Sequence, residues 1–302
     1  MIKSFDEVLK IAKERGPKIL SVACAQDEDV LLAVENARKK GIANAILVGD
    51  KSKIEFISKT INLDLSNYEV IDIVDLKEAS LKAVELVSSG KAHMVMKGLV
   101  DTSIILKAVL DKNIGLRTGN VLSHVAVFDV NDYPRLLLVT DAAMNIAPDL
   151  KGKKQILENS LIVANALDIE VPKVGVICAK EKVNPKMPAT VDAGELVKMN
   201  ENGEIKNCIV GGPFALDNAV SVEAAKIKGI DHPVAGKADI LLCPTIEAGN
   251  VLYKALNFLA KSKSAGIIVG AKAPIVLTSR ADSEEAKLYS IALGVLMAAL
   301  NN

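Results

Sequence analysis

The chain has 302 residues, with 37 basic and 37 acidic side chains and a formal net charge of zero. This balance lacks the basic excess that nucleic-acid-binding proteins use, so no nucleic-acid partner is expected. A chain of this length usually needs more than one hydrophobic core, which predicts two lobes.

The first residues meet acidic side chains at once, where a secretory signal needs an apolar run. The most apolar stretch, Ile291 to Leu300, is far shorter than the roughly 20 residues that cross a bilayer, and predicts a helix that is either buried or part of a self-association surface. Four cysteines lie far apart without a CxxC pair, and three histidines are too well separated for a zinc site. We therefore expect a cytoplasmic protein with no membrane span and no metal centre.

Short runs rich in Val, Ile and Leu alternate with segments of helical period along the chain. This alternation is typical of βαβ units, which build mainly parallel sheets with helices on both faces and so predict an α/β fold. The predicted strands span residues 18–25, 44–49, 69–73, 93–97, 121–128, 135–140, 173–178, 239–243, 266–269 and 274–278. Helices are predicted over 27–40, 76–89 and 102–113, each followed by a glycine, and from Ser283 onwards.

Residues 184–213 break this rhythm with three prolines and a Gly-Gly pair in a polar segment, which predicts an elaborated loop and a short helix in the second lobe. We expect the last helix to return to the first lobe. The first lobe would then contain residues 1–135 and 274–302, and the second would contain residues 136–273.

Neither a GxGxxG after a strand nor a GxxxxGK[ST] motif occurs, so dinucleotide-binding and P-loop folds are disfavoured. Polar side chains gather instead where strands pass into helices, the place where open α/β sheets bind ligands. At the first such junction Lys97, Thr102 and Lys107 would donate to a phosphate. The alternative is that Asp101 or Thr102 caps the helix and the lysines are solvated.

Two more junctions carry candidate residues. Asp141 and Asn145 follow the strand at 135–140 and would orient a ligand, although Asp141 would equally serve as a turn or cap residue. The strand at 274–278 ends in Ser279-Arg280. Arg280 offers a planar fork that matches phosphate, and Ser279 a donor to a carbonyl oxygen that gains charge.

Alternatives remain at this third junction as well. Arg280 would pair with Asp282 at the surface, where such a pair contributes little. Asp282 and Glu285 have the spacing of a capping box, which would occupy the Glu285 carboxylate.

Three segments together resemble the phosphate acetyl/butyryltransferase family over essentially the whole chain: GGPFALDNAVS at 211–221, CPTIEAGNVLYK at 243–254, and the Ser-Arg segment. The unextended length and the IEAGNVLYK segment resemble its clostridial butyryl-transferring members most. The resemblance implies the reaction of butyryl-CoA with phosphate to give butyryl phosphate and CoA, in butyrate fermentation. It implies a two-lobed fold like that of isocitrate and isopropylmalate dehydrogenases, with the active site in the cleft between the lobes. Coenzyme A would be substrate and product, no cofactor would be bound permanently, and a homo-oligomer is expected.

Carried over by motif, Ser279 would polarise the thioester carbonyl and Arg280 would hold phosphate or the developing charge. Lys107 stands where acetyl-specific relatives have an arginine, which removes bidentate binding there. The aspartate that acetyl relatives place on the last helix aligns with Ala286, so Glu285 or Glu284 would replace it as base.

Arg117, Asn120, Asp141 and Asn145 lie in segments that match the family and would line the cleft. Three alternatives to the butyryl reaction stay open: an acetyl- or broader short-chain acyltransferase, a metal- and NAD-dependent dehydrogenase of the same fold, and a catalytically silent subunit that binds CoA.

Overall fold

The computed structural model describes residues 1–278 and 282–300. The chain divides into two compact units, each of which packs mainly against itself. The terminal unit contains Phe5–Asn120 and Ala265–Asn302, and the central unit contains Met1–Ser4 and Val121–Ser264. The boundaries drawn from the sequence, after residues 135 and 273, fall instead between paired antiparallel strands. Pairing between β5 (Ser123–Asp129) and β6 (Leu137–Thr140), and between β10 (Lys263–Val269) and β11 (Ile275–Val276), accounts for this difference.

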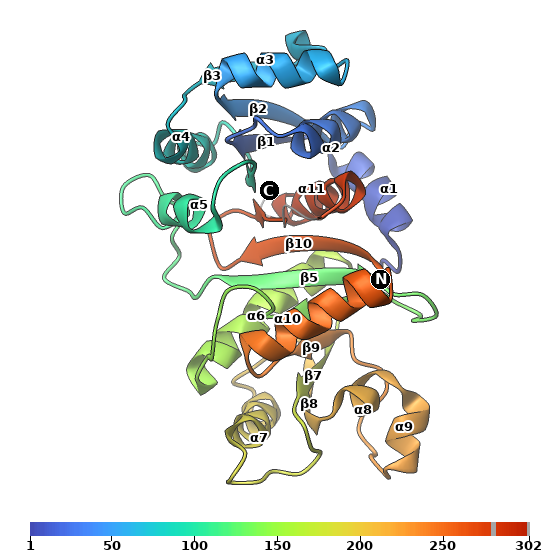
Figure 1. Ribbon diagram of the computed structural model, residues 1–302. Helices are drawn as coiled ribbons and strands as arrows, with labels where there is room; N and C mark the ends of the chain where they lie inside the picture. The colour runs from blue at the N-terminus through green and yellow to red at the C-terminus, as the bar shows by residue number, and fades with distance from the viewer. Residues whose placement is uncertain (279–281, 301–302) are drawn as a thin grey trace. The chain divides into compact units, whose positions relative to one another are not determined.

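The terminal unit is a mainly parallel sheet covered on both faces. Its strands follow the order β3-β2-β1-β4-β11-β10, and the β10–β11 pair is antiparallel. The helices α4 and α5 cover one face, and α1, α2 and α11 pack together on the other (Figure 1). Its elements are α1 (Phe5–Arg15), β1 (Lys18–Ala23), α2 (Glu28–Lys39), β2 (Ala43–Gly49), α3 (Lys51–Thr60), a 3₁₀ turn (Leu65–Asn67), β3 (Glu69–Asp72), α4 (Leu76–Ser88), β4 (Met94–Lys97), α5 (Thr102–Val109), β10 (Lys263–Val269), β11 (Ile275–Val276) and α11 (Glu284–Ala298).

Aspartates start the helices of this unit. The side chains of Asp27, Asp50 and Asp75 each accept a main-chain N–H in the first turn of α2, α3 and α4. Such caps satisfy donors that the helix itself leaves unpaired, and they place a negative charge at the positive end of the helix dipole. The local sequence therefore fixes where each strand–helix unit turns.

The last helix, α11, is the centre of the terminal unit. Every residue from Ile291 to Ala298 is buried, which settles the alternative left open by the sequence in favour of burial over self-association. At Gly294 an added Cβ would lie 2.8 Å from the Met94 sulfur and 3.0 Å from Val276, so glycine is what allows close packing on β4 and β11.

The strands of the central unit follow the order β5-β6-β9-β7-β8 and are parallel except for the β5–β6 pair. A core of buried apolar residues, including Phe128, Val139, Phe214 and Leu241, fills one side of this unit. Its elements are β5 (Ser123–Asp129), β6 (Leu137–Thr140), α6 (Leu150–Ala166), β7 (Lys173–Ile177), α7 (Pro188–Glu201), β8 (Ile209–Phe214), α8 (Leu216–Val220), α9 (Val222–Ile227), β9 (Ile240–Leu242), α10 (Ile246–Lys254) and a π-helical turn (Ala255–Leu259).

The elaborated loop predicted over residues 184–213 is wrong, and the short helix predicted with it is longer than expected. The segment contains the full helix α7 and the strand β8, which pairs in parallel with β7. Pro188 occupies the first turn of α7, where a missing N–H costs nothing. Pro213 lies in β8 at the edge of the sheet, where proline is tolerated. An added Cβ at Gly211 would lie 2.7 Å from the His232 ring, so the Gly-Gly pair reflects tight packing and not a turn.

Candidate active site

The first predicted junction lies where β4 ends and the chain turns toward α5. The Gly98 N–H donates to the Ala23 oxygen and the Leu99 N–H to the Cys24 oxygen, both at 2.8 Å, so the chain leaves the sheet along the end of β1. A Cβ at position 98 would lie 2.3 Å from the Cys24 oxygen, which requires glycine. Lys97 is only 6% exposed, and its Nζ donates to the Gly98 oxygen at 3.2 Å. A buried ammonium group therefore lies at the carboxyl end of parallel strands, where α/β sheets place ligands.

Asp101 occupies the N-cap position of α5, but its side chain makes no cap hydrogen bond, so the capping part of the alternative from the sequence does not hold. Thr102, the first helical residue, is half-buried, and Lys107 is exposed in the last turn. Asn120, at the far end of the loop that follows, is exposed as well. The exposed donors Lys107 and Asn120 thus lie on the short helix α5 and at the end of the loop that follows it.

Arg117 is exposed in a loop whose main chain is anchored on both sides of it. The Leu116 oxygen accepts the Lys272 N–H at 2.8 Å, and the Thr118 hydroxyl donates to the Gly270 oxygen. Both contacts fix the loop to the turn after β10, within the terminal unit. The backbone at Arg117 is therefore held in place while its guanidinium faces solvent.

Asp141, in the central unit, is buried and accepts four hydrogen bonds. Its Oδ1 accepts the N–H groups of Ala143 at 2.8 Å and Met144 at 3.0 Å. Its Oδ2 accepts the His124 N–H at 3.1 Å and the Asn145 side-chain amide at 2.6 Å. The carboxylate organises the turn after β6, as the turn alternative from the sequence predicted.

The turn at Asp141 is also packed against the first turns of α10. The Asn250 side chain donates to the Ala142 oxygen at 3.1 Å, and a Cβ at Gly249 would lie 2.2 Å from the Asp141 oxygen. The Asn145 amide donates at 2.9 Å to the oxygen of Leu122 as well as to Asp141. Asn145 is therefore part of the framework of this turn, and the structure brings it together with Asp141.

Ser279 and Arg280 lie outside the described residues. Glu285, in the first turn of α11, is exposed, and its Oε1 accepts the Tyr289 hydroxyl at 2.6 Å. The Tyr289 ring is stacked on Phe5 with a centroid separation of 4.3 Å. The predicted capping box is not formed here, because Ser283 is the N-cap and its hydroxyl accepts the Ala286 N–H at 3.2 Å.

Lys287 was not singled out from the sequence, although it is a lone cation in an apolar helix. Its residue is 3% exposed. Its Nζ donates to the Asp282 oxygen at 2.5 Å and lies 3.3 Å from the Asp29 carboxylate on α2. The lysine therefore ties the residue that precedes the N-cap of α11 to a neighbouring helix. The signal available in the sequence is a single cation at the start of a helix that is otherwise almost wholly apolar from Leu288 onwards.

The four cysteines are buried thiols. Burial raises the pKa of Cys178 and of Cys208 to about 11, and burial with the nearby Asp141 carboxylate raises the pKa of Cys243 to about 12. Burial is also the main cause that raises the pKa of Cys24. Thiols with such pKa values are protonated at neutral pH, so none of the four is an activated nucleophile.

Within residues 1–278 and 282–300, no three His, Cys, Asp or Glu side chains are grouped so as to hold a metal ion. In the same part of the chain, no helix has the length and hydropathy needed to span a membrane.

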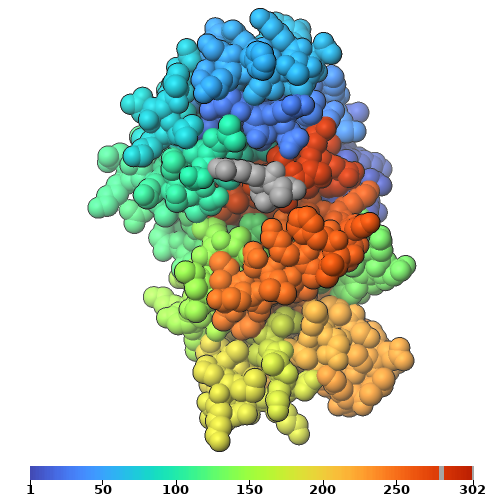
Figure 2. Space-filling model, viewed as in Figure 1, coloured from blue at the N-terminus to red at the C-terminus, as the bar shows by residue number. Residues whose placement is uncertain are grey.

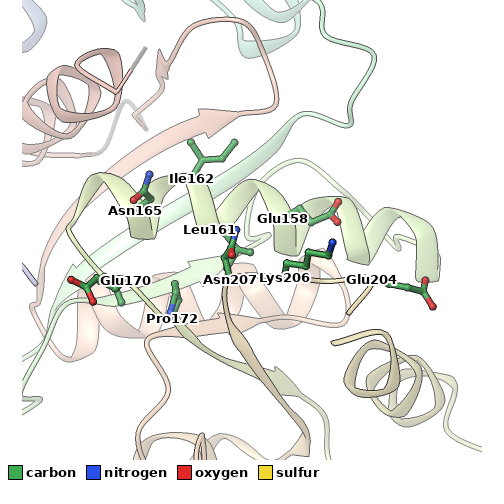
Figure 3. A pocket seen from close by; sticks show the side chains of 10 residues that line it. Glu158, Leu161, Ile162, Asn165, Glu170, Pro172, Glu204, Lys206 and Asn207 are labelled. Carbon is green, nitrogen blue, oxygen red and sulfur yellow. The ribbon is translucent and has the colours of Figure 1, made fainter. Parts of the chain in front are cut away.

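A hollow of about 600 Å³ opens on the central unit between α6 and the turn before β8 (Figure 3). Apolar side chains of Leu161, Ile162 and Ile169 and the carboxylates of Glu158 and Glu170 are among those that line it. None of the predicted site residues is among them. The hollow is therefore separate from the candidate site.

Comparison with known proteins finds relatives of the whole chain. The family model described as phosphate acetyl/butaryl transferase matches residues 4–79 and 74–295. The phosphate butyryltransferase of Clostridium beijerinckii is 56% identical over 301 residues, covering 100% of each chain. The phosphate acetyltransferase of Thermotoga maritima is 49% identical over 293 residues, covering 97% of this chain and 99% of the relative.

Solved structures show the same relationship. A branched-chain phosphotransacylase from Enterococcus faecalis superposes with a TM-score of 0.83 at 35% identity, covering 93% of this chain and 99% of that one. A putative 4-hydroxythreonine-4-phosphate dehydrogenase from Salmonella typhimurium, with a TM-score of 0.59 at 11% identity, covers 93% of this chain and 99% of that one, and shares the fold alone. The predicted dehydrogenase-like α/β fold is thus confirmed, and the chain belongs to the phosphate acetyl/butaryl transferase family.

Proposed function

We propose that this chain is an acyltransferase that catalyses the reversible reaction of butyryl-CoA with inorganic phosphate to give butyryl phosphate and CoA. The observation that carries this proposal is the 56% identity, over the whole chain, to a relative named phosphate butyryltransferase. A second such relative, from Clostridium acetobutylicum, is 55% identical over 298 residues. Coenzyme A serves as substrate and product, and no permanently bound cofactor enters the reaction.

The reaction needs groups that bind the phosphate anion and a hydrogen-bond donor for the thioester carbonyl oxygen. We assign the predicted residues to these tasks. A phosphate oxygen attacks the thioester carbonyl carbon, a C–O bond forms, and the C–S bond breaks as the CoA sulfur leaves with its electron pair and takes up a proton. Arg280, with Lys107, holds the phosphate, and Ser279 donates to the carbonyl oxygen as it gains negative charge. Lys97, Thr102, Arg117 and Asn120 supply further donors around the anionic parts of the substrates.

Direct transfer to phosphate fits the state of the cysteines. A covalent acyl-cysteine route requires a thiolate, and the raised pKa values of all four thiols keep them protonated. In the reverse direction the thiol of CoA, with an ordinary pKa of about 8.5, has to be deprotonated by a neighbouring base.

Glu285 is the carboxylate that we assign as this base. It is exposed and oriented by the hydroxyl of Tyr289. The alternative, Glu284, accepts the side-chain amide of Asn36 on α2. Ala286, which stands at the aspartate position of the acetyl relatives, is 8% exposed and carries no titratable group. The base therefore has to come from a neighbouring position of the same turn.

The site draws on both units in this proposal. Lys97, Lys107 and Arg117 belong to the terminal unit, and Asp141 and Asn145 to the central unit, where they build the turn after β6. We place the substrates in a cleft between two lobes, in a cytoplasmic homo-oligomer of the chain.

The test is phosphate-dependent release of CoA. Purified protein is mixed with butyryl-CoA and a thiol-reactive dye, with and without phosphate, and the released thiol is followed by absorbance. Release that requires phosphate is the expected result. A dehydrogenase would instead require a nicotinamide cofactor, and a silent subunit would bind CoA without releasing thiol, so either result overturns the proposal.

A second candidate is a transferase of acetyl or other short acyl groups, which the Thermotoga maritima relative named phosphate acetyltransferase favours. One methylene in an apolar pocket changes binding by about 1–3 kcal/mol, so the two activities differ by degree. Turnover of acetyl-, propionyl-, butyryl- and valeryl-CoA at equal concentration separates them. A kcat/KM that peaks at butyryl-CoA supports the first candidate, and a peak at acetyl-CoA supports the second.

A further inference from the structure

A second hollow of the central unit, of about 470 Å³, opens beside the turns that follow β7 and α9. It is lined by Lys180, Glu181, Lys182, Lys228, Gly229 and Ile230. Figure 2 shows the α8–α9 segment, in golden orange, at the surface of the central unit. Three of the six lining residues carry an ammonium group and one carries a carboxylate, so positive charge is in excess. Small anions are therefore the solutes that this hollow attracts.

The three lysines of the hollow differ in their partners. The Lys228 Nζ lies 2.7 Å from the Glu181 carboxylate and 3.0 Å from that of Asp217, and these two carboxylates raise the pKa of Lys228. Lys180 and Lys182 are exposed, and in the part of the chain that the structure describes neither of them forms an ion pair. Because Lys228 occupies the carboxylate that lies between them in sequence, both ammonium groups are available to an anion.

The hollow also has an apolar wall. Ile230 is half-buried and packs against the buried core of the central unit, so its position is fixed. At Gly229, beside it, an added Cβ would meet no atom within 4 Å, and the hollow is open there. A solute that joins a short alkyl chain to a doubly charged anionic end matches both parts of this lining. An acyl phosphate with a short chain has this structure.

We propose that Lys180 and Lys182 are acylated by the acyl phosphate that the reaction described above forms. This inference rests on the proposed function for the source of the acyl phosphate. One ammonium group binds the phosphate, the acyl chain lies against Ile230, and the neutral amine of the other lysine attacks the acyl carbon. A C–N bond forms, the C–O bond to phosphate breaks, phosphate leaves with the electron pair, and the amine proton passes to water. Each acylation turns an ammonium group into an amide and removes one positive charge from the hollow.

The first test adds chemically prepared butyryl phosphate to the full chain in the absence of CoA. Peptide mass spectrometry follows the fraction of each lysine that carries a butyryl group. We expect Lys180 and Lys182 to react about tenfold faster than Lys59, because a bound phosphate holds the acyl carbon near the amine. Lys59 is exposed on α3 and has no charged residue within three positions in sequence, so it is the matched control. Equal rates at these three lysines overturn the proposal.

Paired variants separate the binding charge from the attacking amine. Lys180→Arg and Lys180→Gln both remove the amine at this position, but only the arginine keeps a cation that binds phosphate. The rate at Lys182 is expected to stay within about twofold of the wild type in Lys180→Arg and to fall about fivefold in Lys180→Gln. Lys182→Arg and Lys182→Gln are expected to change the rate at Lys180 in the same way. If the arginine and glutamine variants react equally, no charge assists the attack and the site is refuted.

The apolar wall is tested by the length of the acyl chain. The ratio of the rates with butyryl phosphate and acetyl phosphate is expected to be at least about threefold higher at Lys180 and Lys182 than at Lys59, because two further methylene groups contact Ile230. Dividing by the ratio at Lys59 removes the difference in intrinsic reactivity between the two reagents. The same ratio at all three lysines shows that the acyl chain is not bound in the hollow, and overturns the proposal.

A last experiment separates this site from the proposed function. The chain is incubated with butyryl-CoA and phosphate, and butyrylation of Lys180 and Lys182 is expected alongside the release of thiol. If added butyryl phosphate modifies both lysines but butyryl-CoA with phosphate releases no thiol, the site stands and the proposed function fails. If thiol is released and neither source of butyryl phosphate modifies the two lysines, the proposed function stands and the site is overturned.

Discussion

The guanidinium of Arg280 is the group on which the proposed chemistry depends most. In the proposed reaction its planar fork binds two phosphate oxygens at once, which a lysine ammonium group does not do. Arg280→Ala is expected to lower kcat/KM by about 100- to 1,000-fold, and Arg280→Lys is expected to fall between this variant and the wild type. Thiol release under saturating phosphate is the measurement.

The control for this variant is Lys59→Ala, which removes an exposed cation of α3 and is expected to keep full activity. Full activity of a folded Arg280→Ala variant contradicts the assignment of this residue.

Lys287 is expected to act as a positioning residue. Its ammonium holds the oxygen of Asp282, which directly follows the Ser279-Arg280-Ala281 segment in sequence, and it pairs with Asp29 on α2. Lys287→Met keeps the apolar stem and removes both contacts. We expect kcat to fall about tenfold with a smaller change in KM for phosphate, because geometry changes while binding groups remain.

Lys287→Arg keeps the charge and is expected to recover part of the lost kcat. A loss of thermal stability with unchanged kcat in Lys287→Met would assign the lysine a structural role alone.

The sequence could predict which polar residues stand at the ends of strands, but not which of them are bound by neighbours. Asp141 was a candidate for ligand binding from its place after a strand, and the structure shows its four acceptor sites used by the turn and by His124. The hydroxyl of Tyr289 donates to Glu285, but a tyrosine in an apolar helix gives no sign of this contact in the sequence. Such pairings depend on tertiary packing, which residue order alone does not contain.

Among the elements, α10 shows how packing supports the candidate site. Gly249 lets the helix lie directly on the turn at Asp141, since an added Cβ would lie 2.2 Å from a main-chain oxygen. Gly249→Ala therefore has to separate α10 from this turn. We expect a loss of about 1–3 kcal/mol in the free energy of unfolding, measured by urea denaturation.

Gly152→Ala, on α6, is the control. Its Cβ would meet side-chain atoms of Pro148 and Asp149 at 3.2 and 3.3 Å, contacts that small movements relieve. Equal losses in the two variants would mean that the close approach of α10 is not the cause.

The hydrogen-bonded cluster of Glu35, Arg38 and Tyr68 predicts that the free energy of unfolding depends on pH. The Arg38 guanidinium, bonded to Glu35 twice at 2.9 Å, and then the Tyr68 hydroxyl lower the pKa of Glu35 from 4.5 to about 2. A lowered pKa in the folded chain stabilises it above pH 4.5, and this contribution is lost as the pH falls toward 2.

Glu35→Gln is therefore expected to lower the free energy of unfolding by about 2 kcal/mol at pH 7, and by progressively less between pH 4.5 and 2. Denaturant titrations across this pH range measure the difference. Glu55→Gln is the control, because it removes an exposed contact with Lys51 at 3.9 Å. If the free energy of unfolding of Glu35→Gln stays below that of the wild type by a constant amount down to pH 2, the assigned pKa of Glu35 is wrong.

All ten predicted strands are present in the structure, because buried runs of branched apolar residues between turns leave few alternatives. The strand β8 escaped prediction because Gly-Gly-Pro is usually a turn signal, and here it lies at a sheet edge where His232 packs against the glycine backbone. The sequence does not decide whether the last helix is buried in the core or packs against a partner, because the same apolar residues suit both environments.

For the whole molecule, the proposed site makes a prediction about both units at once. If the proposed donors at residues 97–120 and the turn organised by Asp141 both contact CoA, ligand binding has to reduce local opening of both segments. Hydrogen exchange with saturating CoA is expected to slow in residues 98–120 and in residues 141–148. Exchange in residues 203–207, beside the hollow in Figure 3, is expected to stay unchanged. Slowing confined to one of the two segments would remove the other segment from the proposed CoA site.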